Sequence, residues 1–102
     1  MKVVRKLYVS GKITGDRFYR KKFYATYDKL KEAGYFVELP MYAVPKSKGW
    51  QVDMKKALTL MLTCGGIALL PDWEESKGAR IERQRAIDLG MPVKTVEEWV
   101  KR

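Results

Sequence analysis

Short apolar runs recur along the chain between longer polar stretches. Four of these runs predict strands, at Lys6–Ser10, Tyr35–Leu39, Ile67–Leu70 and Met91–Lys94, because they are short and largely apolar. The run at Ile67–Leu70 is apolar at every position, which is typical of a strand that is covered on both faces. The segments between these strands are long enough to hold one helix each.

Helical periodicity fills those segments. Phe23, Tyr27 and Leu30 fall at i, i+4 and i+7 and form one apolar stripe. The predicted helices and loops are, in chain order, a helix from an N-cap at Asp16 to a C-cap at Gly34, a loop over Met41–Gly49, a helix over Trp50–Thr63, a loop over Pro71–Lys77, a helix over Gly78–Leu89, and a last helix that begins at a capping box of Thr95 and Glu98.

Strands that alternate with helices predict an α/β fold with right-handed crossovers. We expect a single doubly wound, flavodoxin- or Rossmann-like domain over residues 1–102, with a parallel sheet of about four strands and helices on both faces. In the flavodoxin-like order the first strand lies between the second and the third, and ligands bind where the strand order reverses. The loops Gly11–Asp16 and Pro71–Lys77 should converge at that point.

Charge and composition narrow the classes of function. The chain carries a net charge of +9, which attracts anions such as nucleotides, but its basic residues are dispersed, so nucleic acid is a possible rather than a favoured partner. Cys64 is the only cysteine, which favours a reducing compartment, the cytoplasm, and no run is long enough to predict a membrane span. The sequence has no histidine, which excludes Ser-His-Asp catalysis and the usual zinc sites. We expect no cofactor and no metal.

Glu82 is the candidate catalytic residue. It falls on the apolar stripe formed by Ala79, Ala86 and Leu89, where a carboxylate is costly unless it has partners or a chemical task. Two interpretations stay open: a structural glutamate that pairs with a neighbouring arginine or caps backbone amides, or a carboxylate that reacts with a ligand.

Two loops offer candidate ligand contacts. The first, Ser10–Gly15, combines glycines, hydroxyls and a lysine, which suit a phosphate or a sugar, although a plain turn fits as well. In the second, Ser76 and Gly78 open a helix, where backbone amides attract anions and where serine is also a common cap. Trp50 and Trp73 are candidate stacking platforms for a base, or core residues.

Two stretches of the sequence resemble a known family. Tyr8–Gly15 looks like the opening of small phage and bacterial proteins of unknown function that are related to nucleoside 2-deoxyribosyltransferases. The stretch from Cys64 to Gly90 is similar as well, with Ser76, Gly78 and Glu82 at a Ser-x-Gly-x-x-x-Glu spacing. The site residues that this resemblance implies are Tyr8, Ser10, Gly11, Lys12, Ile13, Thr14, Gly15, Asp72, Trp73, Ser76 and Gly78 for substrate binding, and Glu82 for catalysis.

The resemblance implies an N-glycosidase or deoxyribosyltransferase. The glutamate at the Glu82 position attacks the anomeric carbon, and the ester that forms is then resolved by a base or by water. A serine at the Ser76 position implies a nucleoside 5′-monophosphate, because it leaves room for a phosphate. Two carboxylates that are usual in relatives are replaced here by Gly65 and Ala57, which affects recognition of the sugar hydroxyls, and Asp72 is a candidate substitute.

Two other functions compete with the enzyme. One is a non-catalytic protein that sequesters a nucleotide, a role that suits a phage protein in the host cytoplasm. The other is a basic nucleic-acid or protein partner whose pocket is vestigial. The helix Trp50–Thr63 carries more apolar residues than one stripe needs, which predicts a homodimer.

Overall fold

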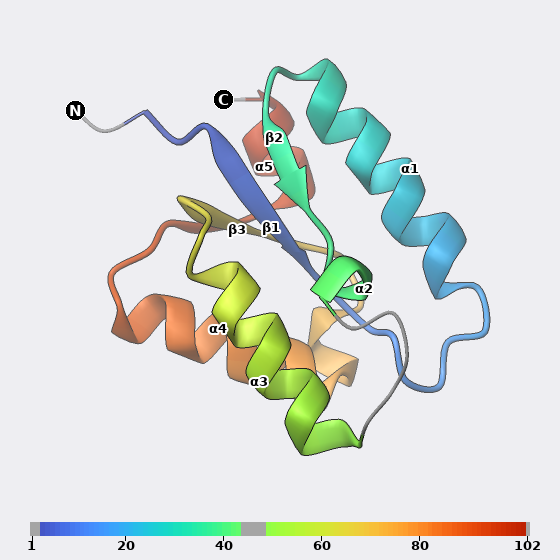
Figure 1. The fold of residues 1–102 in the computed structure, drawn as a ribbon. Helices are drawn as coiled ribbons and strands as arrows, with labels where there is room; N and C mark the ends of the chain where they lie inside the picture. The colour runs from blue at the N-terminus through green and yellow to red at the C-terminus, as the bar shows by residue number, and fades with distance from the viewer. Residues whose placement is uncertain (1–2, 44–48, 102) are drawn as a thin grey trace.

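A computed structural model describes residues 3–43 and 49–101, and within them a four-stranded parallel sheet carries helices on both faces (Figure 1). The elements follow in the order β1 (Lys6–Ser10), α1 (Tyr19–Glu32), β2 (Phe36–Glu38), α2 (Pro40–Ala43), α3 (Trp50–Met61), β3 (Gly66–Leu69), the 3₁₀ turn η1 (Trp73–Glu75), α4 (Lys77–Asp88), β4 (Val93–Thr95) and α5 (Val96–Lys101). The predicted α/β class and doubly wound arrangement are confirmed.

The strand order is β2-β1-β3-β4, so β1 lies between β2 and β3. Leu7 pairs with Val37 of β2, and Tyr8 pairs with Ile67 of β3, both in parallel register. The loops that leave β1 and β3 therefore begin side by side at one edge of the sheet and lead to helices on opposite faces, α1 and α4. This is the place where doubly wound domains bind ligands.

Side-chain alternation along β1 divides the core between the two faces of the sheet. Leu7 and Val9 face a cluster under α1 and α5, whereas Tyr8 faces a cluster under α3 and α4. Trp99 of α5 seals the first cluster, and its indole donates a hydrogen bond of 2.7 Å to the carbonyl of Ile67. Because the alternation has a period of two, Ser10 lies on the α3 and α4 face together with Tyr8.

Two local expectations were wrong. Asp16 is not the N-cap of α1, which begins after Phe18; the Asp16 carboxylate instead accepts the Phe18 amide at 2.9 Å and binds Lys22. Pro40–Ala43 forms the short helix α2, where a loop was expected to start at Met41, because proline is well tolerated in a first helical turn. The capping box is confirmed, since Thr95 and Glu98 exchange both hydrogen bonds.

None of the helices in residues 3–43 and 49–101 is long and apolar enough to cross a membrane.

Candidate functional site

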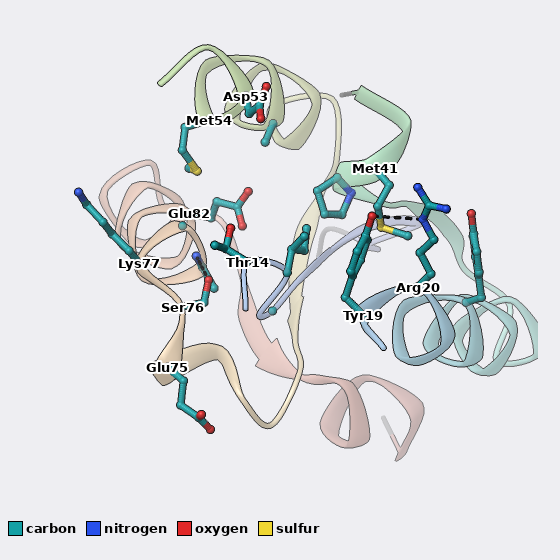
Figure 2. Close-up of a pocket in the computed structure, with 17 residues that line it drawn as sticks. Thr14, Tyr19, Arg20, Met41, Asp53, Met54, Glu75, Ser76, Lys77 and Glu82 are labelled. Atoms are coloured by element: carbon teal, nitrogen blue, oxygen red, sulfur yellow. Dashed lines mark hydrogen bonds between the residues drawn. The ribbon is translucent and has the colours of Figure 1, made fainter. Parts of the chain in front are cut away.

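A cavity of about 910 Å³ opens at the edge of the sheet where β1 and β3 end (Figure 2). Its walls come from the loop after β1, from α1, α2 and α3, and from the start of α4. Figure 2 shows Glu82, Ser76 and Lys77 on one side of this cavity and Tyr19 and Arg20 on the other. The size is in the range of about 300–1,000 Å³ that is typical of small-molecule sites.

Gly11 lets the two loops meet beneath the cavity. A Cβ atom at this position would lie 2.5 Å from Cδ1 and 2.8 Å from Cβ of Leu70, closer than atoms can pack. The Leu70 amide donates to the Ser10 carbonyl at 2.9 Å, so the contact continues the pairing of β1 with β3. Glycine at position 11 is therefore a requirement of close approach, which explains its place in the motif.

The carboxyl group of Glu82 forms the floor of the cavity next to β1. Glu82 is buried in α4, and its Oε1 accepts a hydrogen bond of 2.7 Å from the Ser10 hydroxyl. The Tyr8 hydroxyl donates to Oε2. Both donors lie on one face of β1, two residues apart. Side-chain alternation along one strand therefore places a hydroxyl donor at each oxygen of the carboxyl group.

Burial raises the pKa of Glu82 from 4.5 to about 7, although the hydrogen bonds from Tyr8 and Ser10 act in the opposite direction. The same burial, together with the negative charge of Glu82, raises the pKa of Tyr8 well above its ordinary value. Tyr8 therefore stays a hydrogen-bond donor. No arginine pairs with Glu82 in the described part of the chain, which removes the interpretation of Glu82 as one half of a surface ion pair.

The N-terminus of α4 forms the wall beside Glu82. The Ser76 hydroxyl accepts the Ala79 amide at 3.1 Å, so Ser76 is the cap of the helix. Ser76, Lys77 and Gly78 all line the cavity. A helix N-terminus with a lysine beside it favours an anionic group. The site thus combines a carboxyl group with a helix N-terminus less than two turns away on the same helix.

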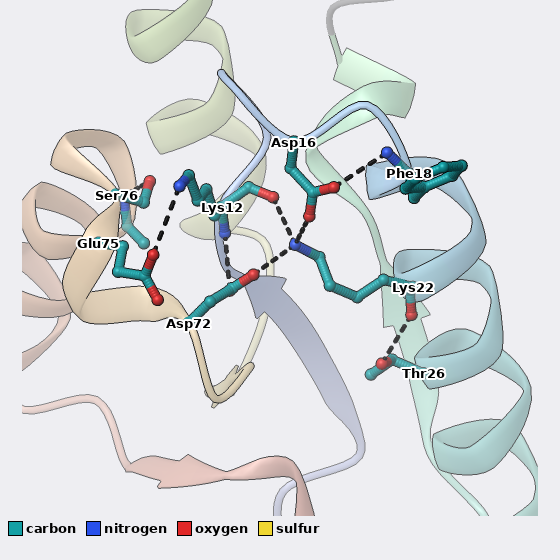
Figure 3. Close-up of polar contacts among 9 residues, drawn as sticks. Lys12, Asp16, Phe18, Lys22, Thr26, Asp72, Glu75 and Ser76 are labelled. Atoms are coloured by element: carbon teal, nitrogen blue, oxygen red, sulfur yellow. Dashed lines mark hydrogen bonds and ion pairs between the residues drawn. The ribbon is translucent and has the colours of Figure 1, made fainter.

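Lys22 of α1 holds the two loops in place from outside the cavity (Figure 3). Its ammonium group donates to the Lys12 carbonyl at 2.8 Å and to the carboxylates of Asp16 and Asp72. Asp72 in turn accepts the Lys12 amide at 3.0 Å. Although partial burial works against it, the bonds to both carboxylates raise the pKa of Lys22. This group of four residues joins the loop after β1 to the loop after β3.

Residues 5–95 match the family described as "Domain of unknown function (DUF4406)". The chain belongs to this family. No curated protein matches the sequence. The match covers every strand, the whole cavity and the Lys22 group, so all of the geometry described above lies inside the DUF4406 domain.

Within this DUF4406 domain, the expected site residues separate into three groups. Those that line the cavity are Gly11, Ile13, Thr14, Ser76, Gly78 and Glu82. Tyr8 and Ser10 lie beneath it and bind Glu82. Those that do not line it are Lys12, Gly15, Asp72 and Trp73.

The members of the third group have other contacts. Lys12 pairs with Glu75, Asp72 pairs with Lys22, and neither lines the cavity, so a ligand contact of either residue stays a prediction that this geometry does not support. Trp73 packs beside the cluster that contains Tyr8, with the Arg83 guanidinium 4.8 Å from its ring centre. The Trp50 side chain lies outside what the structure describes.

The two positions at which the resemblance implies a carboxylate, Gly65 and Ala57, lie in different places relative to the cavity. Gly65 is exposed at the start of β3, where its amide binds the carbonyl of Lys6 at 2.8 Å, so it lies at the edge of the sheet opposite the cavity. Its identity has no direct bearing on a ligand. Ala57, by contrast, lines the cavity from α3.

Sequence reasoning missed several residues that line the cavity. Asp53 stands one turn before Ala57 on α3, on the same wall, and this i, i+4 spacing was the signal that could have found it. Tyr19, Arg20 and Tyr24 line the cavity from α1. They could not be assigned from periodicity because the position of α1 over the cavity depends on the whole fold. In the described residues no group of three or more Cys, Asp or Glu side chains could hold a metal ion.

Proposed function

We propose that this DUF4406 domain cleaves or transfers the N-glycosidic bond of a deoxynucleoside 5′-monophosphate, with Glu82 as the nucleophile. The observation that carries the proposal is the Glu82 carboxyl group, which is buried, faces a nucleotide-sized cavity and accepts a hydroxyl hydrogen bond on each oxygen. A purely structural buried glutamate needs hydrogen-bond donors as well, so it is the position of the carboxyl group at the cavity that favours a chemical role.

The chemistry follows the pattern of retaining glycosidases. A Glu82 oxygen forms a bond to the anomeric carbon as the bond from that carbon to the base nitrogen breaks, and the base leaves with the electron pair and takes a proton from solvent. Water or a second base then attacks the same carbon, and the Glu82 carboxylate leaves. The hydroxyls of Tyr8 and Ser10 fix the carboxylate in line with the sugar before the reaction, which lowers the cost of orientation.

The start of α4 is the proposed phosphate site. Gly78 and Ser76 bring backbone near the ligand, Lys77 adds a positive charge, and the protein as a whole carries +9. Glu82 lies five residues after Lys77 on the same helix, so a 5′-phosphate at the helix start places the sugar next to the nucleophile. The single cysteine is consistent with a reducing compartment, such as the cytoplasm.

Asp53 is the proposed partner of the sugar hydroxyl. Ala57 cannot fill that role, and Asp53 offers a carboxylate on the same wall of the cavity. Asp53→Asn should raise the KM for a deoxynucleotide several-fold and change kcat less, because a neutral amide still fits but accepts weaker hydrogen bonds. A change in kcat alone would contradict this role.

The decisive experiment is a chromatographic assay for free base. The protein is incubated with each of the four deoxynucleoside 5′-monophosphates, and we expect base release from at least one. Glu82→Gln should abolish release while calorimetry still detects nucleotide binding. Glu75→Gln is the matched control, because Glu75 is a cavity carboxylate that is exposed and paired with Lys12.

Two results would overturn the proposal. Tight nucleotide binding without base release from any of the four would make the protein a nucleotide-sequestering one. Absence of both binding and release would leave only a structural or partner-binding role for the domain.

A further inference from the structure

The cavity continues beyond the part that the proposed chemistry uses. Glu82, Asp53 and the start of α4 account for a phosphate and a sugar on one side. On the other side, Tyr19, Arg20 and Tyr24 of α1 line the same cavity together with Pro40 and Met41. Figure 2 shows Tyr19 and Arg20 across the cavity from Glu82 and Lys77, with Thr14 between the two sides. This second side has no part in the reaction at the anomeric carbon.

The chemistry of the second side is that of a base-stacking platform. Tyr24 is 45% exposed although it is a large aromatic residue, so one part of its ring is available to a ligand. Tyr19 lies five residues earlier on α1, where it is half-buried against the core and also lines the cavity, and Met41 adds an apolar side chain from α2. Proteins bind unpaired bases by stacking them on such aromatic side chains, and this stacking depends little on which base is bound.

Arg20 supplies the charge on this side. Its Nε donates to the Tyr19 hydroxyl at 3.2 Å, and its guanidinium lies 5.6 Å from the centre of the Tyr19 ring. These contacts orient the guanidinium and use only its Nε as a hydrogen-bond donor. Arg20 forms no ion pair in the described part of the chain, and the first turn of α1 holds no acidic residue. A planar guanidinium of this kind suits a phosphate group.

We propose that Tyr19, Arg20 and Tyr24 form a second nucleotide subsite, so that the ligand is a dinucleotide rather than a mononucleotide. The first unit places its phosphate at the start of α4, its sugar at Glu82 and its own base near Thr14, between the two sides of the cavity (Figure 2). The second unit stacks its base on the tyrosines and places its phosphate at Arg20. This inference rests on the proposed function for the position of the first unit only.

The test compares the affinity of mononucleotides with that of 5′-phosphorylated dinucleotides by calorimetry. The probes are the four deoxynucleoside 5′-monophosphates and the four matching homodinucleotides. We expect the best dinucleotide to bind at least about tenfold more tightly than its mononucleotide, since one stacked base contributes that much or more. Arg20→Ala and Tyr24→Ala should each remove most of this gain and leave mononucleotide affinity within about twofold.

Arg17→Ala is the matched control. Arg17 also stacks on an aromatic neighbour, with its guanidinium 5.4 Å from the Phe18 ring centre, but it does not line the cavity. The substitution Arg17→Ala removes the same charge near the same end of α1 and should leave the gain in affinity for the dinucleotide unchanged. If Arg17→Ala reduces the gain as much as Arg20→Ala does, the effect is general electrostatics and the subsite is wrong.

Other outcomes separate this inference from the proposed function. Equal affinity for both kinds of probe, or equal loss of both in Arg20→Ala, would overturn the second subsite while base release could still be intact. A dinucleotide gain that depends on Arg20, in a protein that releases no base, would uphold the subsite and overturn the enzyme.

Discussion

At Glu82, burial and hydrogen bonding act on one carboxyl group in opposite directions. Burial raises its pKa to about 7, and the hydroxyls of Tyr8 and Ser10 limit the rise because they stabilise the ionised form. The group is therefore close to half-ionised at neutral pH. A nucleophile has to be ionised, so the geometry of these two donors decides how much of the protein is reactive.

The pH dependence of base release should follow the ionisation of Glu82. We expect the rate to rise with pH through about 7, because the carboxylate forms above its pKa. Tyr8→Phe removes a hydrogen bond that lowers this pKa, so the rising limb should move to higher pH. Tyr35→Phe is the matched control, since the buried Tyr35 hydroxyl binds the Trp99 carbonyl on the other face of the sheet. A rising limb that is unmoved in Tyr8→Phe, or moved equally in both variants, would contradict this assignment.

The same pKa predicts a pH-dependent stability that needs no assay of function. The folded chain holds a proton on Glu82 up to about pH 7, whereas the unfolded chain releases it near the ordinary value of 4.5. The folded state therefore binds more protons in this window, and the free energy of unfolding should fall by up to about 3 kcal/mol as the pH rises from 4.5 to 7. Urea titrations at a series of pH values measure this fall, and Glu82→Gln should flatten it. An unchanged slope in Glu82→Gln would place the titrating group elsewhere.

At the scale of the elements, the sequence pattern predicted the features that depend on neighbouring residues, namely the secondary structure and the buried face of each helix. The alternation of strands and helices predicted the fold, and the register of α4 placed Glu82 on its buried stripe. The N-cap expected at Asp16 was wrong, and Lys12 and Asp72 do not line the cavity, because a partner on another element determines the position of each side chain. Lys22 binds Asp72 from 50 residues away in sequence, and no spacing rule contains that information.

Lys22 should stabilise both the domain and the shape of its cavity. Lys22→Met keeps the helical preference but removes three hydrogen bonds at a largely buried position, so we expect a loss of about 1–3 kcal/mol in unfolding free energy. Nucleotide affinity should fall as well, because the loops that hold Ile13 and Ser76 are then joined by fewer contacts.

The matched control for Lys22 is on the same helix. Lys29→Met breaks the exposed ion pair with Glu97 and should cost about 0–1 kcal/mol with no change in nucleotide affinity. Lys22→Arg should restore part of the affinity if the positive charge holds the loops. If Lys22→Met lowers stability but leaves affinity intact, Lys22 has a structural role alone.

At the scale of the whole molecule, most of the apolar side chains of α3 pack inside the domain and are not available to a partner. Ala57 and Met61 are buried in the core, Leu58 and Leu60 pack against it, and Met54 lines the cavity. The surface left for a partner is smaller than the sequence indicates. Among the side chains that the structure describes, it consists of Val52 and Leu62, which are 44% and 55% exposed near the two ends of the helix.

A homodimer through α3 therefore stays a prediction, with a smaller apolar contact surface than the sequence indicates. Exposed apolar side chains on one helix favour association, and a small hollow of about 200 Å³ between α3 and α4, lined in part by Leu58, Leu62 and Arg85, offers a place for a partner side chain. Sedimentation equilibrium at micromolar concentrations should show a dimer that Leu62→Glu dissociates. Phe36→Glu is the control, because Phe36 is 63% exposed but belongs to β2. A monomer at high micromolar concentration would remove the dimer, and dissociation by Phe36→Glu alone would move the interface from α3 to the edge of the sheet.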